Sequence, residues 1–209
     1  MNTIDHHAIQ TAARVLAGSF AGDPGTAGTL EGLTPEKKQR LLDRHAELHI
    51  RYAAQHGLLH LLDDDPRAFM IGGESTAENR LTEGLFKLKI VLVSVPVLGL
   101  RDFFRLIQNT RKLAAANDLS WYRKHVPKRH YRLKIIAVDP ALRGTGAFRR
   151  LISPALSYAD EHSLTVVLET HNPANVGLYE HFGFELVKTL GCPGLELEQF
   201  CMIRKAGEG

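Results

Sequence analysis

The stretch that most constrains the fold is YRLKIIAVDPALRGTGAFRR, residues 131–150. Its apolar run at 131–138 predicts a buried strand, and Gly144 and Gly146 mark a turn directly after it. After the turn, apolar residues recur at helical spacing, at Phe148, Leu151, Ile152, Ala155, Leu156 and Ala159. A strand, a glycine-rich turn and a helix form a unit that holds phosphate on the amides at the helix N-terminus.

Two known phosphate-binding turns fit this stretch poorly. A P-loop, with the pattern GxxxxGK and then Ser or Thr, is excluded because no lysine follows the glycines at that spacing. A dinucleotide-binding GxGxxG turn needs a third glycine for close helix–strand packing, and the sequence has Arg149 there. Glu169, at the end of the next predicted strand, does resemble the ribose-binding acid of that fold. The dinucleotide interpretation is therefore weakened but stays open.

A third alternative is an acyl-CoA turn, with the pattern Arg/Gln-x-x-Gly-x-Gly/Ala after a strand that ends in Val-x-Pro. Val138, Pro140, Arg143 and Gly146 match this pattern. Consecutive backbone amides of such a loop point at a pyrophosphate, and glycines keep side chains away from the ligand. The final position, where the pattern has Gly or Ala, holds Phe148. That ring is expected either to turn into the core or to narrow the pyrophosphate site.

A second motif, LETHNPANVGLYEHFGFELV at 168–187, strengthens the acyl-CoA interpretation. Asn175 and Tyr179 are four residues apart on a predicted short helix, so they share one face. Gly183 and Phe184 follow at the helix end. Alone, Tyr179 would be interpreted as a half-buried helix tyrosine. Together with the glycine-rich turn, it becomes a candidate site residue.

The remaining pattern predicts an α+β protein. Helices are expected at 4–20, from Thr34 to Gly57, at about 103–113 with another helix before it, and at 172–182. Strands are expected at 58–62, 67–73, 164–168, 184–190 and 195–203. The segment 21–32 is expected to be a loop. Asp63, Asp64 and Asp65 are interpreted as a solvated turn rather than a metal site.

Composition excludes several classes of protein. With 209 residues and 44% hydrophobic content, the chain is expected to form one domain, 1–209. A net charge of +3 is far from the basic stripe of a nucleic-acid binder. The most apolar stretch, residues 90–100, is about half the length of a membrane span. No signal peptide is visible, and Cys192 and Cys201 are expected to be reduced thiols. A cytoplasmic protein is therefore predicted, with no metal, nucleic-acid or membrane partner.

At its two motifs the sequence resembles the GNAT superfamily of acyl-CoA-dependent N-acyltransferases. The resemblance covers residues 130–204, which would be the acyl-CoA-binding core. The stretches HYRLKIIAVDP and LETHNPANVGLYEHFGF look most like the branch that contains puromycin-type antibiotic N-acetyltransferases. The resemblance implies a mixed sheet of about six to seven strands with flanking helices and a splayed central strand pair. It also implies acetyl-CoA as co-substrate.

The family's cofactor contacts carry over to matching positions. Backbone groups of Ile136, Ala137 and Val138 would pair with the pantetheine arm, which Asn175 would also bind. The pyrophosphate would lie on the turn formed by Arg143, Gly144, Thr145, Gly146, Ala147 and Phe148. Arg149 and Arg150 would then either reach the 3′-phosphate or, as favoured, be solvated helix arginines.

The resemblance also implies candidate catalytic residues. A neutral amine would attack the thioester directly, with a backbone N–H near Val138 stabilising the oxyanion. Tyr179 is the expected general acid, protonating the departing thiolate. Glu169 is the first candidate for the base that deprotonates the amine, weighed evenly against a salt-bridged strand-end carboxylate. His130 is the second candidate, with a structural role favoured.

These expectations lead to an acetyl-CoA-dependent N-acetyltransferase that acts on a primary amine of a small molecule. Residues 79–117 would be a helical insertion that covers the substrate as a lid or pocket wall. Two alternatives stay open: acetylation of a protein or peptide, and a non-catalytic acyl-CoA-binding sensor. The sequence leaves a homodimer open as well.

Overall fold

Six strands form one twisted sheet in the computed structural model, which describes residues 5–77, 79–192 and 194–207. The strands are β1 (Leu59–Leu62), β2 (Asp65–Glu74), β3 (Tyr131–Val138), β4 (Val166–Thr170), β5 (Glu185–Gly191) and β6 (Glu198–Arg204). Their order is β1-β2-β3-β4-β6-β5, with β3 and β4 parallel and every other neighbouring pair antiparallel. The predicted mixed sheet is confirmed.

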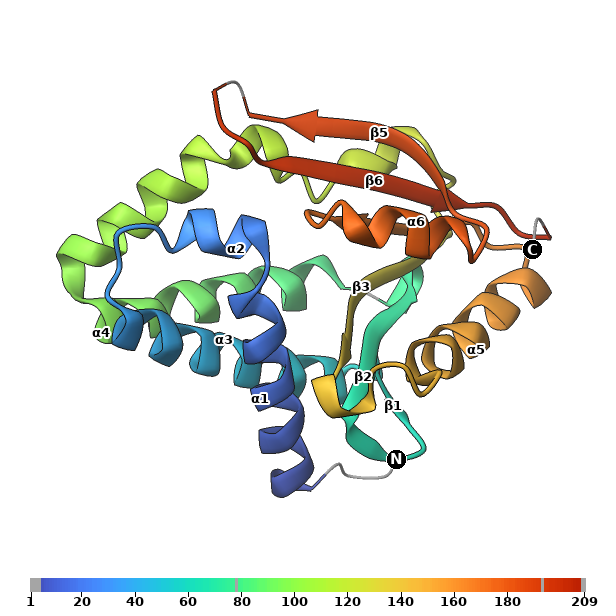
Figure 1. The fold of residues 1–209 in the computed structure, drawn as a ribbon, viewed down its shortest axis with the longest axis horizontal. Helices are drawn as coiled ribbons and strands as arrows, with labels where there is room; N and C mark the ends of the chain where they lie inside the picture. Colours follow the sequence, from blue (N-terminus) through green and yellow to red (C-terminus); the bar gives the residue numbers. More distant parts are fainter. Residues whose placement is uncertain (1–4, 78, 193, 208–209) are drawn as a thin grey trace.

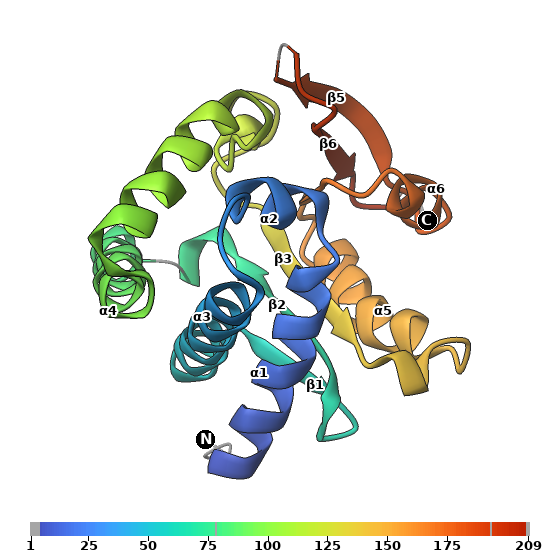
Figure 2. The ribbon, with the colours of Figure 1, turned by 60° about the vertical axis from the view of Figure 1, so that its left-hand side comes forward.

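Helices cover both faces of the sheet (Figures 1 and 2). They are α1 (His6–Ala21), α2 (Pro24–Thr29), α3 (Pro35–Gln55), α4 (Arg80–Lys112), α5 (Ala147–Glu161) and α6 (Ala174–Glu180). Short 3-10 turns occur at Ser75–Ala77, Ala114–Ala116, Trp121–Lys124 and Pro140–Leu142. In Figure 2, α1 and α3 lie on one side of the central strands and α5 lies on the other.

The first three helices begin at capping residues. Asp5 and Thr34 accept hydrogen bonds from backbone amides three residues onward, at 2.6 and 3.4 Å. Asp23 does the same at 2.8 Å and is followed by Pro24 at the start of α2. The expectation of a continuous loop at 21–32 is therefore wrong, because an Asp-Pro cap begins a helix inside this glycine-rich stretch.

The alternation of side chains along β2 divides the core between the two faces of the sheet. Phe69 and Ile71 pack in the cluster formed with α1 and α3. Met70, between them, packs on the opposite face, in the cluster that contains Ile152 of α5. Each of these three β2 side chains is almost fully buried. Helices therefore pack on both faces of the sheet at β2, which adjoins the strand β3 of the candidate site.

Helix α4 contains the predicted two-helix segment as one run with a kink. Gly99 has φ 73° and ψ 165°, which interrupts the helix. Lys37 of α3 holds the kink, donating to the carbonyl of Leu98 at 2.9 Å and to Asp102 at 2.6 Å. Asn109 donates to the carbonyl of Thr29 at the end of α2, at 3.2 Å, and to the carbonyl of Glu31 after it, at 3.0 Å. These bonds attach the second half of α4 to the N-terminal helices.

The two central strands separate along their length. β3 and β4 are paired only at Tyr131–Val166 and Arg132–Val167. Beyond that point β3 stays with β2 as far as Val138, and β4 stays with β6 as far as Thr170. The C-terminal halves of β3 and β4 therefore diverge and leave an opening in the middle of the sheet. The expected splayed strand pair is confirmed.

In the described ranges no helix is long and apolar enough to cross a membrane. Both cysteines are free and buried.

Candidate active site

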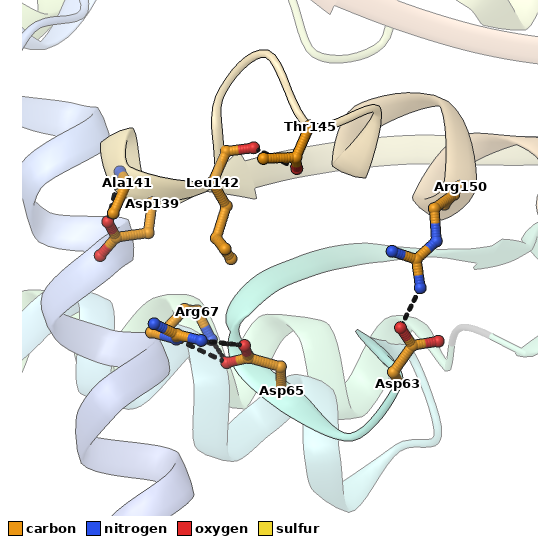
Figure 3. A network of polar contacts seen from close by, with 8 residues as sticks. All are labelled: Asp63, Asp65, Arg67, Asp139, Ala141, Leu142, Thr145 and Arg150. Atoms are coloured by element: carbon orange, nitrogen blue, oxygen red, sulfur yellow. Dashed lines mark hydrogen bonds and ion pairs between the residues drawn. The ribbon is translucent and has the colours of Figure 1, made fainter.

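The glycine-rich turn joins β3 to α5 at the open end of the strand pair. Gly144 and Gly146 have φ values of 76° and 78°, in the left-handed region that favours glycine. The Thr145 hydroxyl donates to the Leu142 carbonyl at 2.7 Å and closes the loop (Figure 3). Gly146 is the N-cap of α5 and has no side chain to bond the first helical amides. Those amides stay available for a ligand with negative charge.

The turn forms one wall of a cleft of about 580 Å³. Ile136 and Val138 of β3 and Asn175 of α6 line other parts of it. The cleft is also lined by the turn residues Arg143, Gly144, Gly146, Ala147 and Phe148. Most of the predicted cofactor-binding residues are therefore brought together around one cleft.

Two of the predicted cofactor-binding residues have side chains away from the cleft lining. Thr145 uses its hydroxyl inside the loop, as described above. The Ala137 side chain is 2% exposed and packs in the α1–α3 cluster, on the opposite face from Ile136 and Val138. Alternation along β3 explains this result, since neighbouring strand residues point to opposite faces. Any contact between Ala137 and a ligand in the cleft would be made by its backbone.

Tyr179 lies at the inner end of the cleft and is 9% exposed. Its ring packs edge-on against the ring of Phe184, with the two centroids 5.8 Å apart. Burial raises the pKa of Tyr179 to about 12. In the described part of the chain its hydroxyl makes no hydrogen bond. The phenol is therefore protonated at neutral pH and has a proton to donate.

Phe148 packs against the core at the edge of the cleft. Its half-buried ring lies 6.0 Å from the Tyr179 ring and 5.5 Å from the Phe182 ring, between centroids. The ring therefore turns toward the core and bridges α5 and α6, as one of the two expectations for this residue has it. That it also narrows a pyrophosphate site stays a prediction.

A second, larger cavity of about 920 Å³ lies on the α1–α4 side of the opening. Its walls are formed by α1, α2, α3 and α4, and its floor by Lys134 to Ile136 of β3 and the end of β4. The two cavities have five lining residues in common, Ser19, Ile136, Asn172, Asn175 and Tyr179. The phenol therefore lies where a molecule in one cavity would meet a molecule in the other.

Glu169 lines the larger cavity, and protein donors hold both of its carboxylate oxygens. Trp121 Nε1 donates to Oε2 at 2.9 Å, and Arg132 Nη2 donates to Oε1 at 2.9 Å. The ion pair is shielded from solvent, with side chains 9% and 11% exposed. Glu169 is therefore a salt-bridged carboxylate at the end of a strand, as one sequence-based interpretation expects. It also lines the larger cavity, as the other interpretation, a catalytic base, requires.

Asn175 is held at the junction by Thr170. Its Nδ2 donates to the Thr170 hydroxyl oxygen at 3.2 Å, which ties α6 to the end of β4. This bond sets the orientation of the amide without using its carbonyl oxygen. Asn175 can therefore still accept a hydrogen bond from a ligand.

The two arginines after the turn have different surroundings. Arg149 lines the smaller cleft, bonds His181 at 2.8 Å and stacks over Phe182 at 5.4 Å. Arg150 points away from this cleft and pairs with Asp63 in the β1–β2 turn (Figure 3). Of the two, Arg149 is the one available to a ligand phosphate.

His130 is buried and lines neither cavity. Its Nδ1 bonds the Pro127 carbonyl at 2.9 Å, and its ring packs 4.9 Å from Tyr122. These contacts agree with the favoured structural role.

Sequence reasoning missed most polar residues of the larger cavity, among them His45 and His49 of α3, Ser94 of α4 and His171 after β4. His171 donates from Nε2 to the Ala116 carbonyl at 2.9 Å, so its ring is tied to the turn after α4. The available signal was weak, because His45 and His49 simply share one face of a predicted helix.

A splayed parallel strand pair, a glycine turn at a helix N-terminus and a buried phenol between two cavities make up the candidate site. The sequence model of the Acetyltransferase (GNAT) family matches residues 102–184, from the second half of α4 to the residue before β5. The match covers less than half of the chain and includes the splayed strands, the glycine-rich turn and Tyr179.

Two curated proteins are similar to part of this chain. An uncharacterized N-acetyltransferase of Schizosaccharomyces pombe is 31% identical over 110 residues, which cover 50% of this chain and 39% of that protein. An uncharacterized protein of Mycobacterium leprae is 38% identical over 63 residues, covering 30% of this chain and 18% of that protein. The chain therefore spans well under half the length of these curated relatives.

The fold is similar to that of a Corynebacterium glutamicum crystal structure described as "histone acetyltransferase HPA2 and related acetyltransferase". The TM-score is 0.60 at 17% identity, and the likeness covers 98% of this chain and 94% of that chain. At this identity the likeness concerns the fold alone, and the chain has the GNAT fold over nearly its full length.

Proposed function

We propose that the protein transfers the acetyl group of acetyl-CoA to a primary amine of a small molecule, by direct attack of the amine on the thioester. The observation that carries this proposal is the meeting of the two cavities at Tyr179 and Asn175. One cavity offers a glycine-rich turn beside free helix amides and the other a space walled by four helices, so two substrates can meet at the opening between β3 and β4.

The smaller cleft fits coenzyme A. A Cβ placed on Gly144 or Gly146 would meet no heavy atom within 4 Å, so the space beside the turn is open for a pyrophosphate. Arg143 and the first amides of α5 supply positive charge there. The unpaired inner edge of β3 at Ile136 and Val138 supplies backbone groups for the pantetheine arm, and Asn175 supplies an amide.

Tyr179 is the proposed general acid. As the amine nitrogen bonds to the thioester carbon, the carbon–sulfur bond breaks and the departing thiolate needs a proton. The phenol lies at the junction of the cavities and, with a pKa of about 12, holds its proton at pH 7. A backbone N–H near Val138 is the proposed donor to the oxyanion.

Glu169 is the proposed base, which takes the proton that an ammonium must lose before attack. Each oxygen of an ionised carboxylate can accept more than one hydrogen bond. Its bonds to Trp121 and Arg132 would thus orient the group and leave capacity for the substrate. The Glu169 side chain lines the larger cavity, where the acceptor would bind.

The four helices that form the walls of the acceptor cavity favour a small molecule over a protein. Residues of α4, among them Ile90, Ser94 and Phe103, form one wall of the cavity, so the segment at 79–117 acts as the proposed cover. A protein acceptor would need an open groove for an extended peptide. The two motifs that resemble the puromycin-type branch also favour a small amine. A cytoplasmic location suits the two free cysteines.

A thioester-cleavage assay tests this function. Purified protein is mixed with acetyl-CoA and one of a set of primary amines or peptides, and release of free CoA thiol is recorded. Amine-dependent thiol release, with N-acetylated amine as product, is the expected result. Tight CoA binding without thiol release from any acceptor would instead favour the sensor, and release with peptides alone would favour a protein substrate.

A further inference from the structure

Two histidines of α3 form a polar patch in the wall of the acceptor cavity. His45 and His49 are one turn apart on α3, and both line the cavity. His45 Nε2 lies 2.9 Å from the Ser94 hydroxyl oxygen, and that hydroxyl lies 2.7 Å from the Ile90 carbonyl. The single hydroxyl proton must go to the carbonyl, so His45 donates from Nε2. This network fixes His45 as a donor to the protein.

His49 lacks such a partner. Its ring lies between two aromatic rings, with centroids 6.2 Å from Phe20 and 4.9 Å from Phe86, both in edge contact. Within the described ranges of the chain, neither of its nitrogens makes a hydrogen bond to protein. Polar groups at such sites are normally paired, and leaving one unpaired is costly. The imidazole is therefore available to a polar group of a molecule inside the cavity.

The patch carries no positive charge at neutral pH. Burial lowers the pKa of His45 to about 4, and burial, with His45 and Lys134 nearby, lowers the pKa of His49 to about 4. A neutral imidazole has one donor and one acceptor nitrogen, which suits a hydroxyl, carbonyl or ether. A second cation brought here would lose its hydration with no carboxylate among the patch residues to replace it.

The larger cavity reaches from α3 to α6, since His49 and Tyr179 both line it. Figure 2 shows α3 and α4 on one side of α1 and α2, and α6 on the other. Apolar side chains such as Leu41, Ile90 and Phe103 line the cavity together with polar ones such as Lys134. A substrate whose amine lies near Tyr179 and that also contacts His49 must therefore carry a second polar group away from its amine.

We propose that the acceptor is a monoamine that carries, away from its amine, an uncharged polar group that hydrogen-bonds to His49. This inference rests on the proposed acetyl transfer and adds the substrate class. It assigns His49 as a specificity-determining residue. Diamines and polyamines, which would place a second ammonium against the patch, are poor substrates on this account.

The test compares three amines that share one body: 2-phenylethylamine, its 4-hydroxy derivative and its 4-aminomethyl derivative. The kcat/KM of the hydroxylated amine is expected to exceed that of the parent roughly tenfold. The value for the aminomethyl derivative is expected to fall at least about tenfold below the parent. In His49→Phe the advantage of the hydroxyl should disappear, while His162→Phe, an exposed histidine outside the cavity, should retain it.

A hydroxyl advantage that is absent in the wild type, or unchanged in His49→Phe, would overturn the proposal. Should His49→Phe fail to fold by circular dichroism, His49→Gln keeps a donor and an acceptor and should retain the preference. Calorimetric titration of the three amines into the protein with CoA provides a second readout. If hydroxyl-dependent binding is lost in His49→Phe but no amine releases thiol, the acetyl-transfer proposal fails and the His49 site stands. If binding shows no such preference, the His49 proposal itself fails.

Discussion

The rings of Tyr179 and Phe148 lie 6.0 Å apart, between centroids, and join the two halves of the candidate site. Phe148 is in the first turn of α5, directly after the glycine-rich loop, while Tyr179 is on α6. Contact between them couples the position of the anion-binding turn to the position of the phenol. Phe148, which departs from the acyl-CoA turn pattern, thus has a structural role between α5 and α6.

Gly146 is predicted to be required for CoA binding and dispensable for folding. Gly146→Val places a branched side chain into the open space beside the turn and strains a backbone with φ 78°. CoA affinity should fall at least about a hundredfold, since both the loop shape and the α5 amides are affected. Calorimetry with CoA measures this, and circular dichroism checks the fold.

Gly57→Val is the matched control for this change. Gly57 has φ 67°, equally open space, and a position outside both cavities of the candidate site. The Gly57→Val variant should have a similar backbone strain and should bind CoA as tightly as the wild type. Equal CoA affinity in the two variants would show that the turn is not the pyrophosphate site.

Glu169→Gln separates the two roles that the structure allows for this carboxylate. As the base, Glu169 should contribute roughly a hundredfold to kcat/KM, and the variant should lose the acidic limb of the pH–rate profile. The variant should also lose stability, because Arg132 is left without its buried partner. The measurements are a pH–rate profile and thermal unfolding.

Asp160→Asn breaks another ion pair, with Arg204 at 2.7 Å, and neither of these residues lines the two cavities of the candidate site. It should lower stability and leave the pH–rate profile unchanged. If Glu169→Gln behaves in the same way, the carboxylate is a structural ion-pair partner and the base lies elsewhere.

Stability is predicted to fall as the pH drops from 7 to 5. His45 and His49 have their pKa lowered from 6.5 to about 4 in the folded state, so between these values the unfolded chain binds more protons. Protonation therefore favours unfolding, and each ring should contribute a loss of about 2 kcal/mol over this interval. Urea unfolding of the wild type at several pH values measures the slope.

His49→Phe should remove about half of that pH dependence, whatever it does to stability at pH 7. His162→Phe should leave the slope as it is in the wild type. An unchanged slope in His49→Phe would mean that His49 titrates normally and that the histidine patch is hydrated.

Local sequence patterns predicted the elements around the smaller cleft well. The strand, turn and helix at 131–159 are contiguous, so their signals do not depend on distant partners. Asn175 and Tyr179 were placed on one face by helical spacing, and the structure places both at the junction of the cavities. Helix α2 was missed because glycines in 21–32 outweighed the Asp23-Pro24 cap.

The acceptor side could not be predicted, because it depends on contacts between distant segments. Ser94 reaches His45 across 49 positions, and Trp121 reaches Glu169 across 48. Four helices and the floor of the sheet surround the histidine patch, and burial is the largest cause of the low pKa of both rings. A single sequence contains no local signal for such an enclosure.

Tyr179→Phe tests the central claim most directly, because it removes one hydroxyl and preserves the ring contacts with Phe148 and Phe184. Tyr158→Phe, an exposed tyrosine of α5, serves as control. Thiol-release kinetics and CoA calorimetry are measured on both. The account predicts that Tyr179→Phe lowers turnover roughly a hundredfold, with CoA affinity nearly unchanged and Tyr158→Phe fully active. Unchanged turnover in Tyr179→Phe would contradict it.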